Sequence, residues 1–182
     1  MKKFELTSEF ITNIFGTKLF RIKALIEFGN VKAGELGGFV EKEENLSQDG
    51  NAWVYDNARV CGDARVHGNA RVYDNARVYD NAWVYGNAWV YDNARVYGDA
   101  CVYGDARVCG DAGYATVHGF GSEYRTTTFF KTKAGVGVKC GCFYGNLSEF
   151  RKKVVETHGE TKKAKEYLML ADLMEFRFSD NS

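Results

Sequence analysis

Small apolar residues recur along the middle of this chain with a period of six positions between Gly50 and Gly113. Each unit reads alanine, a variable residue, valine and a second variable residue, followed by a turn-forming pair such as Gly-Asn, Asp-Asn or Gly-Asp. Because alternate side chains of an extended strand point to opposite sides, alanine and valine share one side of a short strand. Asn and Gly tolerate the left-handed conformation that tight corners need. Each hexapeptide therefore predicts one strand and one corner.

A second period of 18 residues sets how many strands make one coil. Two corner columns repeat at this spacing, one of glycine and one of aspartate: Gly50, Gly68, Gly86 and Gly104, and Asp56, Asp74 and Asp92 (the aspartate column). Repetition at 18 in addition to six residues predicts three hexapeptides per turn, and therefore a triangular prism. Stacked coils of such a prism lie at the interstrand spacing of about 4.8 Å.

The array begins before its most regular part and covers residues 36–113, which predicts about four coils. Its first members fit the repeat less well: Leu36, Lys42 and Gln48 at valine positions, and Val40 and Leu46 at alanine positions. A charged or amide side chain is unfavourable in the apolar interior unless it is hydrogen-bonded. We therefore expect the first coil to be distorted or looped out around residues 41–45.

The N-terminal segment, residues 1–35, lacks the repeat. Partial alternation over residues 18–28 predicts a strand, paired with an earlier strand across a turn at residues 13–17. An open solenoid end exposes an apolar cross-section and unpaired backbone groups, so solenoids need caps. We expect this segment to be a β cap over the first coil.

The C-terminal segment, residues 114–182, predicts a second cap. Its β-branched and aromatic content predicts strands at 125–132 and 135–144. A capping box at Asn146 begins a first helix, and a second amphipathic helix covers about 161–177. The fold class is thus mainly β: a parallel β-helix between an N-terminal β cap and a C-terminal ββαα cap.

The variable residues beside each valine point outward, and the 18-residue period sorts them onto three faces. The first face alternates indole and guanidinium groups one coil apart, which suits cation–π stacking. It carries Trp53, Arg71, Trp89 and Arg107 beside Tyr55, Tyr73 and Tyr91. Because large amphipathic aromatic patches are typical of association surfaces, we predict a subunit interface here. Side-chain ladders within one chain and a ligand surface are the alternatives.

The second face stacks three guanidinium groups at the coil spacing, where like charges repel. It carries Arg59, Arg77 and Arg95 (the arginine column) beside Tyr79 and Tyr97. One interpretation is neutralisation by the aspartate column, which lies three residues before each arginine. The other is capture of an anion such as phosphate or a nucleotide, since arginine pairs bidentately with phosphate and tyrosine offers a stacking surface.

Two histidines could act as a catalytic base. His67 occupies a tyrosine column of the third face, so we expect an exposed substitution there. His118 follows the array and is the better candidate for a site. The neighbouring polar residues that could contact a ligand are Arg125, Thr126, Thr127 and Thr128.

Composition narrows the range of partners. Lysine plus arginine equals aspartate plus glutamate at 24 each, so bulk charge predicts neither duplex DNA nor a membrane as a partner. No apolar run approaches the ~20 residues of a membrane span. Five cysteines at unrelated spacings argue against a disulfide framework, which favours a cytoplasmic protein. Cys140 and Cys142 lack the second pair that a zinc site needs, so we expect no metal and no cofactor.

Over most of its length the chain resembles a family of bacterial and phage hexapeptide-repeat proteins. The resemblance lies in the array, in the preceding segment GELGGFVEKEENLSQDGNAWVY, and in the following segment TTTFFKTKAGVGVKCGCFYGNLSEF with VETHG after it. It implies the left-handed parallel β-helix fold and a homotrimer whose prisms pack side by side. Members are often labelled acyltransferases, which implies acyl-CoA as a substrate, and His118 would then be the base.

Three functions are consistent with these observations. The main hypothesis is a non-catalytic homotrimeric protein that binds an anionic or aromatic ligand. In a phage setting, such a protein could sequester a nucleotide-like host signal or block a host protein. The first alternative is acyl transfer to a small acceptor. The second is a structural module that holds the subunits of a larger assembly.

Overall fold

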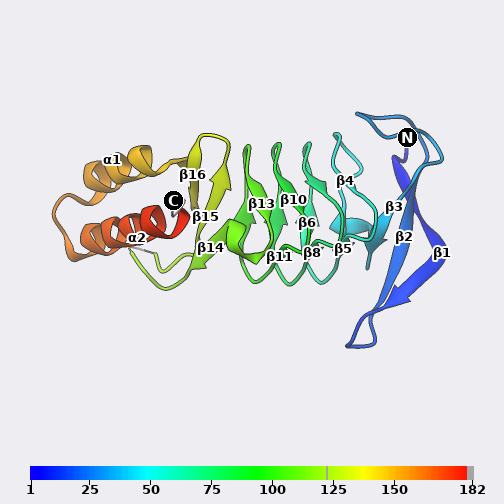
Figure 1. Ribbon diagram of the computed structural model, residues 1–182, viewed down its shortest axis with the longest axis horizontal. Helices are drawn as coiled ribbons and strands as arrows, with labels where there is room; N and C mark the ends of the chain where they lie inside the picture. Colours follow the sequence, from blue (N-terminus) through cyan, green and yellow to red (C-terminus); the bar gives the residue numbers. More distant parts are fainter. Residues whose placement is uncertain (122, 180–182) are drawn as a thin grey trace. The chain divides into compact units, whose positions relative to one another are not determined.

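The computed structural model describes residues 1–121 and 123–179. The chain divides into two compact units, Met1–Ala112 and Gly113–Ser182. The first unit contains both the N-terminal hairpin and the hexapeptide array (Figure 1). The second unit contains a small antiparallel sheet and two helices.

The array folds as a parallel solenoid in which each hexapeptide supplies one short strand (Figure 1). The strands are β4 (Trp53–Val54), β5 (Arg59–Val60), β6 (Arg65–Val66), β7 (Arg71–Val72), β8 (Arg77–Val78), β9 (Trp83–Val84), β10 (Trp89–Tyr91), β11 (Arg95–Val96), β12 (Cys101–Val102) and β13 (Arg107–Cys109). Each strand pairs with the strand three further along, as Val54 does with Val72. This register confirms the predicted solenoid of about four coils with three hexapeptides in each.

The interior of the solenoid is made of the two repeating apolar residues. Every alanine from Ala52 to Ala106 and every valine from Val54 to Val108 in the array is no more than 1% exposed. Burying a valine side chain contributes about 1.5 kcal/mol or more. The narrow prism is therefore filled by small side chains in repeated layers.

The corners take the left-handed backbone conformation at the first residue of each turn-forming pair, whether glycine or aspartate. Asp56, Asp74 and Asp92 have φ of 51°, 60° and 58°. This conformation is unfavourable for residues with a Cβ, although aspartate tolerates it better than most. Their carboxylates accept backbone N–H groups of the next coil, Asp56 from Asp74 and Asp74 from Asp92. These bonds help to hold aspartate where glycine is otherwise preferred.

The first coil is two residues longer than the others, which corrects the predicted phase. Val40 pairs with Val60, and Leu46 pairs with Val66, each across 20 residues instead of 18. Both residues therefore occupy valine positions and are buried, and the prediction of alanine positions was wrong. Leu36, predicted at a valine position, is 53% exposed.

The two additional residues lie between Leu46 and Val54. The predicted distortion around residues 41–45 is a separate feature of the same coil, the 3-10 helix η1 (Glu43–Asn45). Lys42 and Gln48 do not enter the apolar interior. The ammonium group of Lys42 instead pairs with a corner carboxylate at 2.7 Å. The Gln48 side chain accepts two backbone N–H groups from the start of the chain.

The N-terminal segment forms the predicted cap. Strands β1 (Phe4–Thr12) and β2 (Lys18–Ala24) pair as a hairpin, and β2 pairs with β3 (Leu36–Val40), which joins the parallel sheet through β5. The rings of Phe4 and Phe28 contact the indole of Trp53 at centroid distances of 6.1 Å and 5.3 Å. Trp53 is consequently fully buried.

In each coil, some backbone groups bond to the next coil and others to the preceding coil, as in any parallel ladder. Amide N–H groups at fixed positions of one coil donate to carbonyls of the next, as from Asn51 to Gly68 and from Trp53 to Ala70. The carbonyls at the corresponding positions of the first coil, such as Gly50 and Ala52, therefore face the end of the solenoid. An unpaired carbonyl buried at such an end would lower the stability of the fold.

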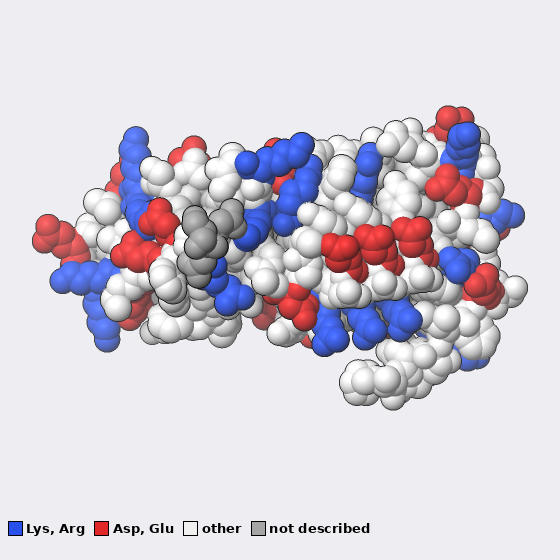
Figure 2. Space-filling model, viewed as in Figure 1, with Lys and Arg blue, Asp and Glu red and all other residues white. Residues whose placement is uncertain are grey.

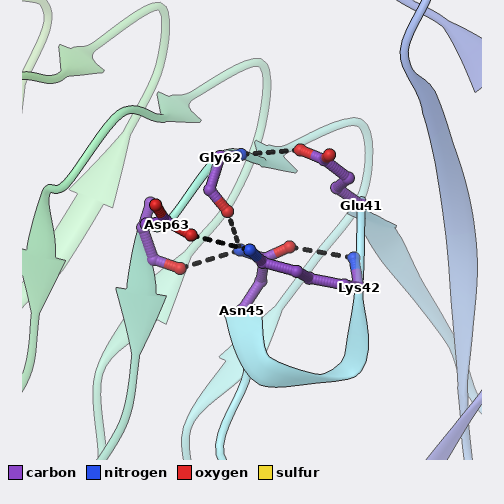
Figure 3. Close-up of polar contacts among 6 residues, drawn as sticks. Glu41, Lys42, Asn45, Gly62 and Asp63 are labelled. Atoms are coloured by element: carbon purple, nitrogen blue, oxygen red, sulfur yellow. Dashed lines mark hydrogen bonds and ion pairs between the residues drawn. The ribbon is translucent and has the colours of Figure 1, made fainter.

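Side chains supply donors at this end. Lys3 Nζ donates to Ala52 O at 3.0 Å and to Gly50 O at 3.5 Å. Asn45 Nδ2 donates to Ala64 O at 2.8 Å and to Gly62 O at 3.0 Å. Arg21 Nη1 donates to Gly37 O at 2.7 Å and to Asp56 O at 3.3 Å. Figure 3 shows Asn45 in this role beside the Lys42–Asp63 ion pair. The Glu41 carboxylate accepts the Gly62 N–H at 2.7 Å in the same cluster.

The C-terminal unit differs in part from the predicted ββαα arrangement. Its sheet has the order β14 (Tyr114–Val117), β15 (Thr127–Thr132), β16 (Gly135–Cys140) and β17 (Phe143–Asn146), all antiparallel. The prediction of one strand over 135–144 was wrong, because Gly141 takes a positive φ and turns the chain between β16 and β17. A further strand, β14, extends the sheet beside β15.

Helices α1 (Leu147–His158) and α2 (Lys162–Phe178) cover one side of this sheet. The predicted capping box is present: Asn146 accepts the Glu149 N–H, and the Glu149 carboxylate accepts the Asn146 N–H, both at 2.9 Å. The core between helices and sheet consists of Phe129, Val138, Leu147, Phe150, Val154, Ala164, Tyr167, Ala171, Met174 and Phe178. Arg151 links the helices through ion pairs with Asp172 and Glu175.

Replacing Asn45 with alanine tests the role of side-chain donors at the first coil. Asn45 is fully buried and bonds two carbonyls, so we expect N45A to lose about 1 to 3 kcal/mol of unfolding free energy in urea. The matched control is N75A, since the Asn75 side chain is exposed and makes no hydrogen bond within the described residues. Equal losses in both variants would contradict the donor role.

The buried ammonium group of Lys3 predicts a pH-dependent stability. Burial lowers the pKa of Lys3 to about 8, partly opposed by Asp49. Between pH 8 and about 10.5 the unfolded chain holds a proton that the folded chain has lost, so the unfolding free energy should rise with pH by up to ~3 kcal/mol. Urea titrations of the wild type, K3M and the exposed control K2M should show this rise in all but K3M. A rise of the same size in K3M would refute the assignment.

Candidate functional site

The second face of the solenoid brings the arginine column together as predicted. Strand pairing places Arg59 opposite Arg77, and Arg77 opposite Arg95, in direct register. Neighbouring arginines therefore lie one interstrand spacing apart, about 4.8 Å at the backbone. Figure 2 shows a row of basic side chains beside a row of acidic ones along the solenoid, as this register requires.

The guanidinium groups of this column form no ion pair with a carboxylate of the described residues. Within residues 1–121 and 123–179, no acidic group lies within the 4.0 Å ion-pair distance of Arg59, Arg77 or Arg95. The carboxylates of the aspartate column bond elsewhere, to backbone N–H groups of the following coil. That of Asp92 lies 2.7 Å from the Cys109 thiol. Direct ion pairing with the aspartate column, one of the two interpretations of this face, is therefore absent from the described structure.

Both ends of the column are closed by other groups. Beyond Arg59, the position on β3 is held by Phe39, whose ring lies under the Arg21 guanidinium at 4.4 Å. Arg21 is already held by Glu9 and by backbone carbonyls. Beyond Arg95, the Asp111 carboxylate accepts the Arg95 backbone N–H at 2.9 Å. The column consequently presents a run of adjacent guanidinium groups with defined ends.

The tyrosines of this face stack on each other. The rings of Tyr79 and Tyr97 lie 5.3 Å apart at an angle of 11°. Burial raises the pKa of Tyr79, and the neighbouring Tyr97 raises it further, so Tyr79 stays a neutral hydroxyl donor. Tyr97 is 51% exposed. The face thus combines cations with phenol hydroxyls along parallel rows.

The first face contains the predicted cation–π stack, with one correction. The guanidinium groups of Arg71 and Arg107 lie 5.4 Å and 4.3 Å from the Trp89 ring. Tyr73 and Tyr91 stack with centroids 5.3 Å apart, and Tyr55 contacts the ring of Tyr73.

The prediction that Trp53 lies on the outside of the first face was wrong. The N-terminal hairpin covers it completely, so it cannot contribute to an outer interface. The remaining side chains of the face form a ladder within one chain. A subunit interface on them stays a prediction.

The third face places His67 in a ring stack instead of an open site. Its ring lies 4.8 Å from Tyr85 at an angle of 4°, and Nε2 is buried without a partner among the described residues. Burial lowers the pKa of His67, and the Arg65 charge lowers it further. Arg65 itself lies over Trp83 at 5.5 Å. His67 is therefore a packed, neutral ring and not the exposed substitution that we predicted.

The residues after the array assemble only in part. His118 is exposed, and its Nδ1 lies 3.1 Å from the Thr126 hydroxyl. Arg125 is exposed and lies 3.8 Å from Glu123. Thr127 and Thr128, predicted to contact a ligand, are 2% and 0% exposed. Both lie on β15, where sheet pairing buries them, so their availability to a ligand was predicted wrongly.

The described residues lack two further kinds of feature, metal-binding clusters and membrane-spanning helices. They contain no group of three or more His, Cys, Asp or Glu side chains that could hold a metal ion. None of their helices is both long and apolar enough to cross a membrane.

Sequence reasoning missed the groups that close the column. The alternation around Arg21 shows that its side chain points outward, but the antiparallel register that places it on Phe39 is not encoded in any repeat. Lys3 and Asn45 gave no signal, because each acts once and far from its partners in sequence.

Comparison with known proteins agrees with the repeat architecture. The YdcK beta-solenoid repeat family matches residues 52–68, 70–86 and 88–104. The chain is also 40% identical over 63 residues to a protein of Escherichia coli (strain K12) named uncharacterized acetyltransferase YdcK. That match covers 31% of this chain and only 19% of the relative. Residues 52–104 thus consist of beta-solenoid repeats of the YdcK type, which confirms the resemblance to hexapeptide-repeat proteins that carry acyltransferase names.

Proposed function

We propose that this protein is a non-catalytic binding protein that captures an anionic ligand on the arginine column. The supporting observation is the direct register of Arg59, Arg77 and Arg95 with no carboxylate in ion-pair distance among the described residues. Arginine binds phosphate and carboxylate groups bidentately through its planar guanidinium group. An anion bound along the column would provide a countercharge in direct contact, which the described residues do not supply.

The energetics of the column favour a functional role over a structural one. Two unit charges 4.8 Å apart repel by ~1 kcal/mol in bulk water, and more where the protein lowers the effective dielectric. Other arginines of the solenoid avoid this repulsion by alternating with tryptophan, as Arg71 and Arg107 do around Trp89. Groups arranged against local stability are typical of functional sites.

The finer form of the proposal is a homotrimer in the cytoplasm that sequesters a nucleotide-like host signal, or blocks a host protein, in a phage setting. Its support is the anion-binding chemistry of the arginine column. The homotrimer is the association that the resemblance to hexapeptide-repeat proteins implies. The exposed part of the aromatic first face is its proposed contact surface.

Acyl transfer with His118 as base is the second candidate, and the name of the Escherichia coli relative favours it. The geometry gives it less support. The ring of His118 contacts a neutral threonine hydroxyl instead of an orienting carboxylate. The regular strands from β4 to β13 leave no extruded loop that could form a substrate groove.

Replacing Arg77 with glutamine should not destabilise the fold, because it removes both neighbouring repulsions at once. We expect R77Q to unfold at the same or a slightly higher temperature at low salt, with a difference that shrinks as salt screens the charges. R107Q is the matched control, since it removes a guanidinium 4.3 Å from the Trp89 ring and should lose about 0.5 to 1 kcal/mol. Equal destabilisation of both variants at all salt concentrations would refute the repulsion.

Calorimetry with pyrophosphate, adenosine triphosphate and a galacturonic acid trimer tests the proposed function. The wild type should release heat with at least one of these anions, and the variant R59Q/R77Q/R95Q should release none. The matched control R65Q/R71Q/R107Q removes the same charge from the other two faces and should still bind, provided that its melting curve shows a folded protein. Absence of heat with all three anions, or equal binding by both triple variants, would overturn the proposal. Turnover of acetyl-CoA that H118A abolishes would support acyl transfer instead.

A further inference from the structure

We infer that the ligand of the arginine column is a linear polyanion that carries one acidic group per ~5 Å of its length, namely an acidic polysaccharide with a carboxylate on each sugar. This inference rests on the proposed function, since it names the ligand class of the same site. It is based on the spacing of the arginines, on the length of the column and on the acidic residues beside it.

The spacing of the column is set by the backbone and is therefore rigid. Strand pairing fixes Arg59, Arg77 and Arg95 at one interstrand spacing each, so the outer two lie ~10 Å apart at the backbone. A compact anion such as phosphate contacts all the guanidinium groups only if the outer side chains bend toward the middle one. A chain that repeats its charge at the coil spacing reaches all of them without bending.

The closed ends limit the number of charges that bind. Phe39 replaces the guanidinium group before Arg59, and Asp111 adds a negative charge after Arg95. Within the described residues of the first unit, a longer polyanion gains no further unpaired guanidinium partner along this face, because Arg21 on Phe39 is held by Glu9. The site therefore fits three consecutive acidic groups.

Acidic borders limit the width of the ligand. The aspartate column runs along one side of the arginine column. By the 18-residue repeat, the corner on the other side carries Asp63, Asp80 and Asp99. Of these, Asp63 is paired with Lys42. A ligand with two rows of charge, such as a nucleic acid duplex, would place one row against these carboxylates. A single narrow chain avoids this repulsion.

The tyrosine stack argues against single-stranded nucleic acid. Such strands bind by stacking bases on exposed aromatic faces. A base inserted between two rings needs twice the ~3.4 Å stacking distance, which is ~7 Å. Tyr79 and Tyr97 are only 5.3 Å apart and nearly parallel, so they occupy each other's faces.

The same tyrosines suit a sugar chain. Within the described residues, their hydroxyl groups make no hydrogen bond, so they are available to sugar hydroxyls beside the carboxylates. A phenol hydroxyl both donates and accepts hydrogen bonds, as sugar hydroxyls do. The face thus offers one row of cations for the acidic groups and one row of hydroxyls for the rest of each sugar.

Calorimetry with galacturonic acid oligomers of one to six units tests this inference. Because successive contacts on one chain are intramolecular, affinity should rise at least ~10-fold per added unit up to three units and then stay level. Methyl-esterified oligomers of the same length, which lack the charge, should not bind. Affinity should fall steeply with added salt. R77Q, which removes the middle guanidinium, should weaken the trimer at least ~30-fold, whereas R65Q should change it less than threefold.

The outcomes separate this inference from the proposed function. Tighter binding of oligothymidylate than of the galacturonate trimer would overturn the polysaccharide assignment. So would an affinity independent of oligomer length, or binding of pyrophosphate and adenosine triphosphate alone. In those cases the column still binds anions and the proposed function stands. Absence of binding by every oligomer and every small anion would remove both.

Discussion

The hydrogen-bonded ladder between successive coils is the constraint on which the rest of this structure depends. Amide N–H groups at fixed positions of one coil donate to a carbonyl 17 residues further on, as from Asn51 to Gly68, so every position repeats on the same face at the same height interval. This single relation stacks valine on valine inside and arginine on arginine outside. It also leaves carbonyls of the first coil without a preceding coil, and side chains such as those of Lys3 and Asn45 donate to them.

The sequence was sufficient for everything that repeats. Two periods predicted the strands, the corners, the interior residues and the alignment of the arginine column, because a repeat states the same local preference many times. It was insufficient for features that occur once. The additional two residues in the first coil shift Val40 and Leu46 to valine positions, and no periodicity marks where those residues enter. In the C-terminal unit, a positive φ at Gly141 makes two strands of a predicted one.

The candidate site shows the same division. The 18-residue period predicts the arginine column. It does not predict whether the column is ion-paired, because that depends on the direction of each nearby carboxylate side chain. The aspartate column lies three residues away in sequence and still bonds to backbone amides, since its left-handed corners point the carboxylates along the solenoid. Trp53, Thr127 and Thr128 fit the pattern of outward or polar residues, yet other elements bury them.

The ladder between coils has a consequence for how this architecture can change in length. Each coil meets only its two neighbours, and its own hexapeptides already supply every group that the next coil requires. An 18-residue duplication placed between β8 and β11 would therefore add a rung without disturbing either terminus. The number of 18-residue duplications in the gene would then set the number of stacked arginines, and hence the length of the basic column.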